Sequence, residues 1–379
     1  MSELSIEQAL READRCVKCG LCLPHCPTYR LYADENESPR GRIALAEGLL
    51  RGQLDKAPHL VDHLYRCLMC RRCETVCPSG VRYTRLLDAA RAEAPQSHWA
   101  TRFTNGSRTS RLLSRAARAT RLPGNTLSAV AGALPTSQPP APGRYPARGE
   151  LRGKVGLFLG CATSLYQGNA LNAAVDLLTG LGYAVVIPSK QACCGALAKH
   201  QGDQETAQRL IDANREAFST LDTVIGIASG CTVQLVETMG TQRKVVDIVT
   251  FLHQALAAKP FDIPRLEACA ALHLPCTAVN ALGNAQENRK LLQRIPGLEL
   301  HPIGEAGDCC GAAGDHLLTQ RRQAETLRQP LLDELIELGP RYLLTSNIGC
   351  ALHLAEGARK AGVPLEVLHP VELLARQLT

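Results

Sequence analysis

Short apolar runs alternate with amphipathic segments through residues 151–379. The apolar runs have the length of buried strands, and the segments between them, such as 204–218 and 321–339, have helical periodicity. Strands that alternate with helices are typical of α/β folds with a largely parallel sheet. We therefore expect a Rossmann-like α/β structure here, with any ligand site at the ends of the strands.

The same region contains an internal repeat. The first copy contains KVGLFLGCATS, AVVIPSKQACCG and TVIGIASGCTVQL, and the second contains ACAALHLPCTAV, LELHPIGEAGDCCGAAG and YLLTSNIGCALHL. In each copy 31 or 32 residues separate a first cysteine from a Cys-Cys-Gly, and 36 or 39 residues separate that motif from a last cysteine. The repeat predicts two equivalent α/β domains at residues 151–265 and 266–379.

The first 150 residues have a different pattern. Two helical segments, RIALAEGLLRGQL and LVDHLYRCLMC, predict an α-helical domain over residues 1–90. Residues 91–150 begin as a basic helix and end in the Pro-rich stretch PTSQPPAPGRYP, which is typical of an extended linker. The basic helix has an arginine stripe, formed by Arg108, Arg111, Arg115 and Arg118. It is either a solvated face or a docking face for a partner or an anionic lipid surface.

Composition and charge exclude one class of partner. The 379 residues are 45% hydrophobic but only 4% aromatic, and their formal net charge is +6. This mild positive charge suits docking to an acidic partner or an anionic membrane surface. It is too diffuse for nucleic-acid binding, because no aromatic residues are interleaved with the basic ones.

The 17 cysteines are the most informative residues. The N-terminal sequence MSELSIEQALREADR is charged and has no apolar signal segment, and no apolar run reaches the length of a membrane span. We therefore expect a cytoplasmic protein with reduced thiols, peripheral on the inner face of the membrane at most. Clustered cysteines in that compartment are metal ligands or redox groups.

Two cysteine runs in the N-terminal domain indicate iron–sulfur clusters. Both match C-x2-C-x2-C-x3-C-P, the pattern of two-cluster bacterial ferredoxins, in which the fourth cysteine ligates the other cluster. The predicted ligands of cluster 1 are Cys16, Cys19, Cys22 and Cys77, and those of cluster 2 are Cys26, Cys67, Cys70 and Cys73. Structural zinc sites are the alternative, but they need four cysteines each and no trailing Cys-Pro.

The insert between the runs contains the segment Pro39-Arg40-Gly41-Arg42. Forty residues separate Cys26 from Cys67, which is long for a compact ferredoxin and favours the α-helical type of domain. The arginines of this segment either donate hydrogen bonds near the cluster sulfurs or are the solvated start of a helix.

The two α/β repeats have eight more cysteines at matched positions, Cys161, Cys193, Cys194, Cys231, Cys276, Cys309, Cys310 and Cys350. Adjacent thiolates can both face a metal if the following Gly195 or Gly311 loosens the turn. The eight cysteines would suit one iron–sulfur centre per repeat, one centre shared between the repeats, or an empty site of buried thiols. Cys269 has no counterpart in the first copy.

Together these motifs resemble the glycolate oxidase iron–sulfur subunit family over nearly the whole chain. The resemblance depends on CVKCGLCLPHCPTYRL, SPRGRI, RCLMCRRCETVCPSGVRY, ACCGA, ASGC, CCGAAG and SNIGCALHL. It implies an α-helical ferredoxin domain followed by two Cys-Cys-Gly domains. It also implies FAD-binding glycolate oxidase subunits as partners, and a quinone or another electron acceptor.

The chain departs from related heterodisulfide reductases at the end of each repeat. Those proteins end in CxxC, whereas Gln234 and His353 stand where the additional cysteine would be. Either residue could instead supply a ligand, although a plain polar role is the simpler interpretation. The departure argues against a thiol–disulfide enzyme, which remains an alternative.

The chain has no G-x-G-x-x-G fingerprint for a flavin or nicotinamide. A hydroxy acid loses a hydride equivalent on oxidation, and a cofactor must accept it. We therefore expect FAD on a partner subunit and an electron relay, with no hydride chemistry, on this chain. D-lactate or another 2-hydroxy acid is the alternative donor.

Overall fold

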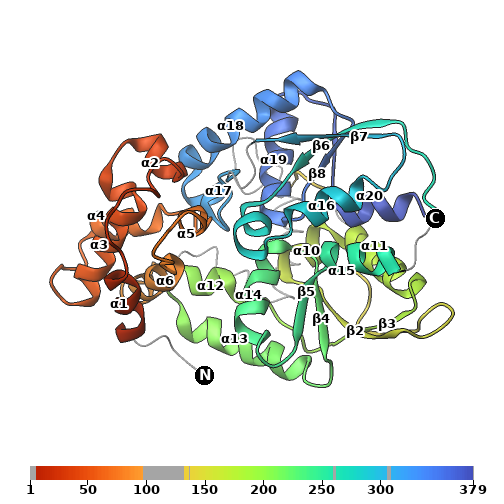
Figure 1. Cartoon of the computed structure of the whole chain (residues 1–379), viewed down its shortest axis with the longest axis horizontal. Helices are drawn as coiled ribbons and strands as arrows, with labels where there is room; N and C mark the ends of the chain where they lie inside the picture. The colour runs from red at the N-terminus through yellow and green to blue at the C-terminus, as the bar shows by residue number, and fades with distance from the viewer. Residues whose placement is uncertain (1–5, 97–131, 136, 259–261, 305–308, 379) are drawn as a thin grey trace.

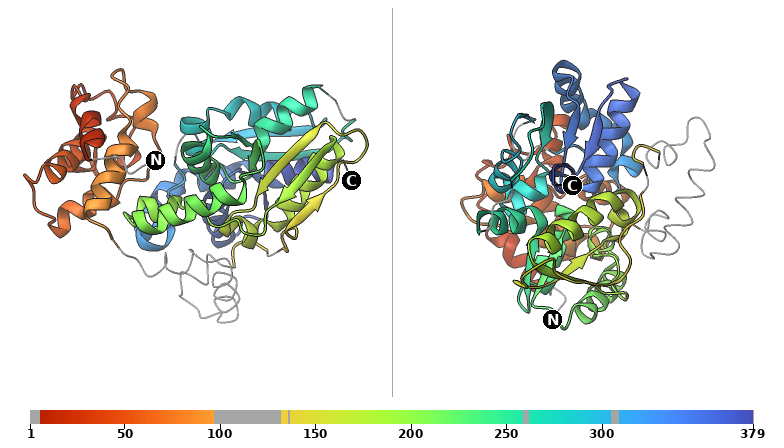
Figure 2. Two further views of the ribbon diagram at one scale, coloured as in Figure 1. Left: turned by 90° about the horizontal axis from the view of Figure 1, so that it is seen from below. Right: turned by 90° about the vertical axis from the view of Figure 1, so that its right-hand side faces the viewer.

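The computed structural model describes residues 6–96, 132–135, 137–258, 262–304 and 309–378. A helical N-terminal part lies at one end of a larger α/β part (Figure 1, Figure 2). The predicted order, a helical part followed by two α/β repeats with mainly parallel strands, is confirmed at this level.

Helices build the N-terminal part, and no strand occurs within its described residues, 6–96. They are α1 (Ile6–Asp14), α2 (Pro27–Tyr32), the 3-10 helix η1 (Glu35–Glu37), α3 (Pro39–Leu50), α4 (Pro58–Tyr65), α5 (Arg72–Thr75) and α6 (Tyr83–Glu93). Proline at the first position fixes the starts of α2, α3 and α4. The backbone N–H of Gly41 also donates to the Ser38 hydroxyl at 2.9 Å, which caps α3.

The first repeat contains a five-stranded sheet in the order β1-β3-β2-β4-β5. Its strands are β1 (Gly143–Tyr145), β2 (Gly153–Phe158), β3 (Tyr183–Ile187), β4 (Thr223–Gly226) and β5 (Lys244–Asp247). Its helices are α10 (Cys161–Tyr166), α11 (Gly168–Gly180), α12 (Ala196–His200), α13 (Gln204–Ala217), α14 (Ser229–Met239) and α15 (Ile248–Ala258). β1 pairs antiparallel with β3, and the other neighbours are parallel.

The second repeat contains a four-stranded parallel sheet in the order β7-β6-β8-β9. Its strands are β6 (Ala268–His273), β7 (Leu298–Ile303), β8 (Tyr342–Leu344) and β9 (Glu366–Leu368). Its helices are the π-helix η2 (Ala278–Leu282), α16 (Ala285–Leu292), α17 (His316–Thr319), α18 (Arg321–Leu338), α19 (Ile348–Lys360) and α20 (Pro370–Arg376). This order repeats β3-β2-β4-β5 of the first sheet, so the sequence repeat is also a repeat of topology.

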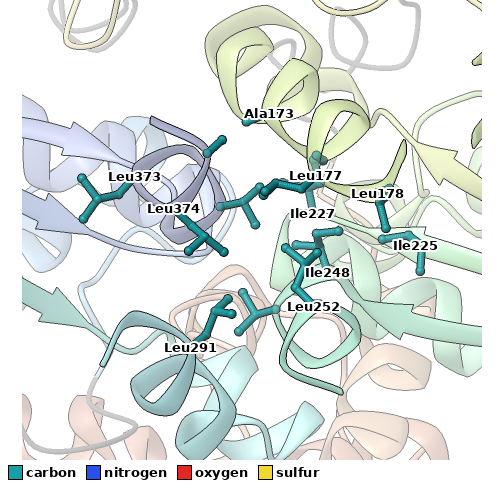
Figure 3. Packing of buried hydrophobic residues seen from close by; sticks show 14 of the residues in the cluster. Ala173, Leu177, Leu178, Ile225, Ile227, Ile248, Leu252, Leu291, Leu373 and Leu374 are labelled. Atoms are coloured by element: carbon teal, nitrogen blue, oxygen red, sulfur yellow. The ribbon is translucent and has the colours of Figure 1, made fainter. Parts of the chain in front are cut away.

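The two repeats share one hydrophobic core. Helices α11 and α15 of the first repeat meet α16 and α20 of the second, and their apolar side chains interdigitate (Figure 3). Leu177 and Leu252 from one repeat and Leu291 and Leu374 from the other are at most 4% exposed. Because neither repeat covers this surface alone, the repeats form one folding unit.

Polar contacts join the helical part to both repeats. Asp88 on α6 binds the Nδ1 of His200 at 2.9 Å and the Nζ of Lys199 at 3.3 Å, both at the end of α12. The Tyr65 hydroxyl donates to the carbonyl of Gln201 at 2.8 Å. In the second repeat, the side-chain amide of Gln323 donates to the carbonyl of Arg66 at 3.0 Å. These contacts fix the helical part against the α/β unit.

The segment predicted as a basic helix and linker is described only in part. The arginine stripe lies outside the described residues. The end of the Pro-rich stretch forms β1, and the backbone N–H of Asn169 donates to the Ser137 hydroxyl at 2.8 Å. Among the described residues, no helix combines the length and the apolar character needed to cross a membrane.

We predict that Asp88→Asn weakens the contact between α6 and α12. Burial raises the pKa of Asp88, but His200 and Lys199 outweigh it and hold the pKa at about 2. A depressed carboxyl pKa contributes stability above the unfolded value, and this stability is lost as the pH falls toward 2. The loss near neutral pH should be about 2 kcal/mol, visible as faster hydrogen exchange of α6 and α12.

Asp176→Asn is the matched control. Asp176 pairs with Arg148 at 2.7 Å, and its side chain is 48% exposed. An exposed pair contributes little, so exchange at α6 and α12 should not change. Equal effects of the two substitutions would contradict a specific role of Asp88.

Candidate functional site

A cavity in the helical part gathers the cysteines predicted for cluster 1. Three of them lie in the loop between α1 and α2, and the fourth follows α5. The lining includes Cys16, Cys19, Cys22 and Cys77, together with Cys73, Arg40 and Ile43. The first run therefore meets the last cysteine of the second run.

A neighbouring cavity gathers the cysteines predicted for cluster 2. Its lining includes Cys26, Cys67, Cys70 and Cys73, with Thr28, Arg42 and Tyr83. Burial raises the pKa of Cys70 and Cys73 well above the ordinary thiol value. Metal binding at these residues would have to displace their protons, because only the thiolate is a strong ligand.

The two cysteine runs adopt matching backbone conformations. The second residue after the first cysteine has a positive φ in both runs, 56° at Lys18 and 53° at Met69. The residue after the second cysteine also does, 83° at Gly20 and 60° at Arg71. Glycine adopts this conformation without strain, but Arg71 does so at a cost. Its guanidinium pairs with Glu237 on α14, a contact made only in the docked structure.

Arg42 is a buried cation beside the second cavity. It is 1% exposed and forms an ion pair with Glu37, which is fully buried. It also donates to the Thr28 hydroxyl at 2.9 Å, and that hydroxyl lies 3.3 Å from the Cys26 sulfur. The interpretation of Arg42 as the solvated start of a helix is therefore wrong. Arg40 lines the first cavity and donates to the carbonyl of Lys18 at 3.2 Å.

The four cysteines of the first repeat come together around the carboxyl end of its sheet. Cys161 begins α10 after β2, Cys193 and Cys194 follow β3, and Cys231 lies in the first turn of α14. The Cys161 thiol donates to the Cys193 sulfur at 3.5 Å. Hydrogen bonds from Cys161 and Cys194 hold the pKa of Cys193 well below its ordinary value. The three thiols therefore interact directly.

The four cysteines of the second repeat adopt the same arrangement. A hydrogen bond between Cys276 and Cys309 raises the pKa of Cys276, and the Cys310 and Cys350 sulfurs lie 3.0 Å apart. The glycine of each Cys-Cys-Gly has a φ of 86°. A Cβ on Gly311 would lie 2.5 Å from the carbonyl oxygen of Ala324, so the turn requires glycine there.

Sequence reasoning missed a histidine next to this second group. A ring nitrogen of His273 and the sulfurs of Cys310 and Cys350 lie within 4.8 Å of one another. The signal available was the position of His273, three residues before Cys276 at the end of an apolar run. His353, the alternative considered from sequence, is buried, and its Nε2 lies 3.1 Å from the Ala324 carbonyl oxygen. Gln234 is also buried.

The cysteine groups form a continuous series. Burial is the main cause of the raised pKa of Cys70, and the charge of Cys276 adds to it. Helix α5 contacts η2, so the second cavity and the second repeat's group lie close together. The side-chain amide of Asn280 also donates to the carbonyl of Cys70 at 2.9 Å. Between the repeats, the hydroxyls of Ser229 and Thr277 lie 2.7 Å apart. Ser229 is two residues before Cys231, and Thr277 directly follows Cys276. Cys73 lines both cavities, so the series runs from the first cavity through the second to both α/β groups.

Comparison with known families agrees with this division of the chain. Residues 12–81 match a 4Fe-4S dicluster domain, and residues 155–236 and 270–355 match a cysteine-rich domain.

Three known proteins cover much of the chain. The glycolate oxidase iron–sulfur subunit of Escherichia coli (strain K12) is 33% identical over 96% of this chain and 93% of its own length. A probable glycolate oxidase iron–sulfur subunit of Bacillus subtilis (strain 168) is 29% identical, covering 95% and 92%. Lactate utilization protein A of Geobacillus sp. (strain WCH70) is 26% identical over 58% of this chain and 98% of its own length.

We predict that Arg42→Met destabilises the helical domain. Without Arg42, the buried Glu37 keeps only the partly exposed Arg66 at 2.9 Å and the His63 ring at 2.7 Å. Breaking a buried ion pair typically costs about 3 kcal/mol, and these remaining partners should hold the cost near or below that value. Urea unfolding of the anaerobically purified chain, followed by loss of visible absorption, would measure this cost.

Arg51→Met is the matched control at the end of α3. Arg51 pairs with Asp14 and Glu47, and its side chain is 36% exposed. Its loss should cost less than about 1 kcal/mol. If the two variants unfold at the same urea concentration, the buried pair is not needed for stability.

Proposed function

The chain belongs to the glycolate oxidase iron–sulfur subunit family, and we propose that it relays electrons within an FAD-dependent glycolate dehydrogenase. That complex would oxidise glycolate to glyoxylate on an FAD-binding partner subunit. This chain would receive the electrons and pass them toward a quinone or another acceptor. The full-length similarity to two glycolate oxidase iron–sulfur subunits supports the assignment of the donor.

In this proposal the two cavities of the helical domain each hold a [4Fe–4S] cluster. Cys16, Cys19, Cys22 and Cys77 would bind cluster 1. Cys26, Cys67, Cys70 and Cys73 would bind cluster 2. Bound there, the clusters would supply one-electron redox chemistry. The lining of each cavity by one complete set supports this crossed assignment.

The α/β cysteines would hold further iron–sulfur or metal centres. The tentative ligands are Cys161, Cys193, Cys194 and Cys231 in the first repeat, and Cys276, Cys309, Cys310 and Cys350 in the second. Their convergence at the carboxyl ends of the strands supports one centre per repeat.

The observation that carries the proposal is the continuous series of four cysteine groups. Electron transfer needs closely spaced redox centres, and the contact of Cys70 with the second repeat links the helical domain to the α/β unit. A chain that only stored metal would not need its sites close together.

The partner subunit would approach the open side of the first cavity. Cys19 is exposed, and the apolar side chains of Val17 and Leu21 on either side of it are 69% and 56% exposed. Arg15 and Lys18 are exposed in the same loop. These apolar and basic side chains suit a partner surface that has an apolar centre and an acidic rim.

D-lactate is the second candidate donor. The Geobacillus relative named for lactate utilization matches 58% of the chain and supports it. The choice between the donors would be made on the flavin subunit. A heterodisulfide reductase-like activity has less support, because His353 is buried and bonded where such proteins have an additional cysteine.

We predict that Cys77→Ser removes cluster 1, although Cys77 lies 55 residues after Cys22. Iron content after anaerobic reconstitution should fall by about four atoms per chain. The remaining paramagnetic resonance signal should match that of Cys19→Ser and differ from that of Cys70→Ser.

Cys269→Ser is the control, because Cys269 belongs to neither run and to neither set of matched positions. It should retain all its iron. A Cys77→Ser spectrum that matches Cys70→Ser would show that the runs do not exchange their fourth ligand.

The relay itself is tested on the anaerobically co-purified complex. Glycolate should reduce the [4Fe–4S] clusters, seen by electron paramagnetic resonance, whereas the isolated chain should have no glycolate:dye activity. If D-lactate but not glycolate reduces the clusters, the donor is D-lactate. Reduction by dithionite alone would remove both acids as donors.

A further inference from the structure

His273 lies where two parallel strands of the second repeat end side by side. It is the last residue of β6, and Thr345 follows the end of β8, the neighbouring strand. Cys276 follows His273 by three residues, and Cys350 lies in the first turn of α19. Strand ends of this kind are the usual ligand sites of open α/β sheets.

The imidazole of His273 has a hydrogen-bond partner at one ring nitrogen but not at the other. The ring is 2% exposed, and its Nδ1 lies 3.0 Å from the Thr345 hydroxyl oxygen. Its Nε2 is buried and has no hydrogen-bond partner. An unpaired buried polar atom costs free energy, so a ligand for this nitrogen is expected.

The first repeat shows that the fold does not need an imidazole at this position. Phe158 stands three residues before Cys161, at the same place as His273 before Cys276. Phe158 also ends its strand, is 2% exposed and packs against Phe218. A hydrocarbon ring, packed in an apolar cluster that includes Cys194, therefore fills this position in the first repeat. Packing alone therefore does not explain why the second repeat has a histidine at this position.

We propose that His273 is a nitrogen ligand of a metal centre in the second repeat, together with the thiolates of Cys310 and Cys350. The geometry that carries this proposal is the mutual distance of at most 4.8 Å between a ring nitrogen of His273 and the two sulfurs, together with the unpaired, buried Nε2. Borderline-soft transition metals, either iron in a cluster or zinc, accept mixed imidazole and thiolate ligands. The first repeat would then hold an all-sulfur centre.

The hydrogen bond to Thr345 fits this role. Metal-binding histidines commonly donate their other N–H to an oxygen, which fixes the tautomer and the ring orientation. A proton on Nδ1 would donate to the Thr345 hydroxyl and leave the Nε2 lone pair free.

His353 does not compete for the role within this repeat. Its Nε2 lies 3.1 Å from the Ala324 carbonyl oxygen, and its Nδ1 lies 3.3 Å from the Arg328 guanidinium. Both nitrogens are therefore occupied by protein groups, whereas one nitrogen of His273 is not.

The test uses the isolated full-length chain labelled with 15N-histidine and no substrate or partner. It deepens the proposed metal binding by the α/β cysteines but is independent of the electron donor. One arm loads the chain with ferrous iron and sulfide, and the other with zinc. We expect metal beyond the ferredoxin clusters in at least one arm, with a histidine 15N coupling for iron or a Zn–N distance near 2.0 Å by X-ray absorption.

Three variants give the proposal its controls. His273→Phe introduces the residue of the first repeat, and it should remove the metal of the second repeat and the nitrogen signal, while metal held by the first repeat stays. Thr345→Val should weaken metal binding by roughly 10- to 100-fold. His301 on the neighbouring strand β7 is exposed, so His301→Phe should change neither the metal content nor the nitrogen signal. Full metal retention in His273→Phe would overturn the proposal. The absence of histidine nitrogen at the metal of the unsubstituted chain would also overturn it, even if the variant does not fold.

Discussion

The structure depends on the apolar surface that the two α/β repeats bury against each other. Neither sheet is covered on this side by helices of its own repeat alone, so α11 and α15 must pack with α16 and α20. This shared core fixes the angle between the sheets and therefore the positions of their strand ends. The hydroxyls of Ser229 and Thr277 can meet only because the core holds those ends together. The helical domain then docks on a surface to which both repeats contribute.

Patterns local to the sequence predicted much of this architecture. The two cysteine runs, the helical insert and the repeated α/β pattern are all visible within short windows, because each depends on periodicity or spacing. The gathering of Cys77 with the first run was also predictable, since three thiolates in one short loop leave a fourth position open.

Other features depend on contacts between distant residues and could not be predicted in this way. Arg42 looks like a surface residue in the sequence, and only the fold shows that Glu37, Thr28 and the His63 carbonyl surround it. The contact between Cys70 and Asn280 joins residues 210 positions apart. His273 lies in an apolar run that predicts only a strand, and its sulfur neighbours come from two other segments.

The conformation of Arg71 has a consequence for the order of events during synthesis. This residue holds a left-handed backbone in the loop between Cys70 and Cys73, and its ion-pair partner Glu237 lies 166 residues later. At ordinary rates of translation, that stretch takes roughly ten to thirty seconds to emerge. During this interval the loop lacks the contact that compensates its strained backbone, while the first run is already complete. Until Glu237 has been made, the second cysteine run of a nascent chain therefore lacks the contact that holds its loop in the folded protein.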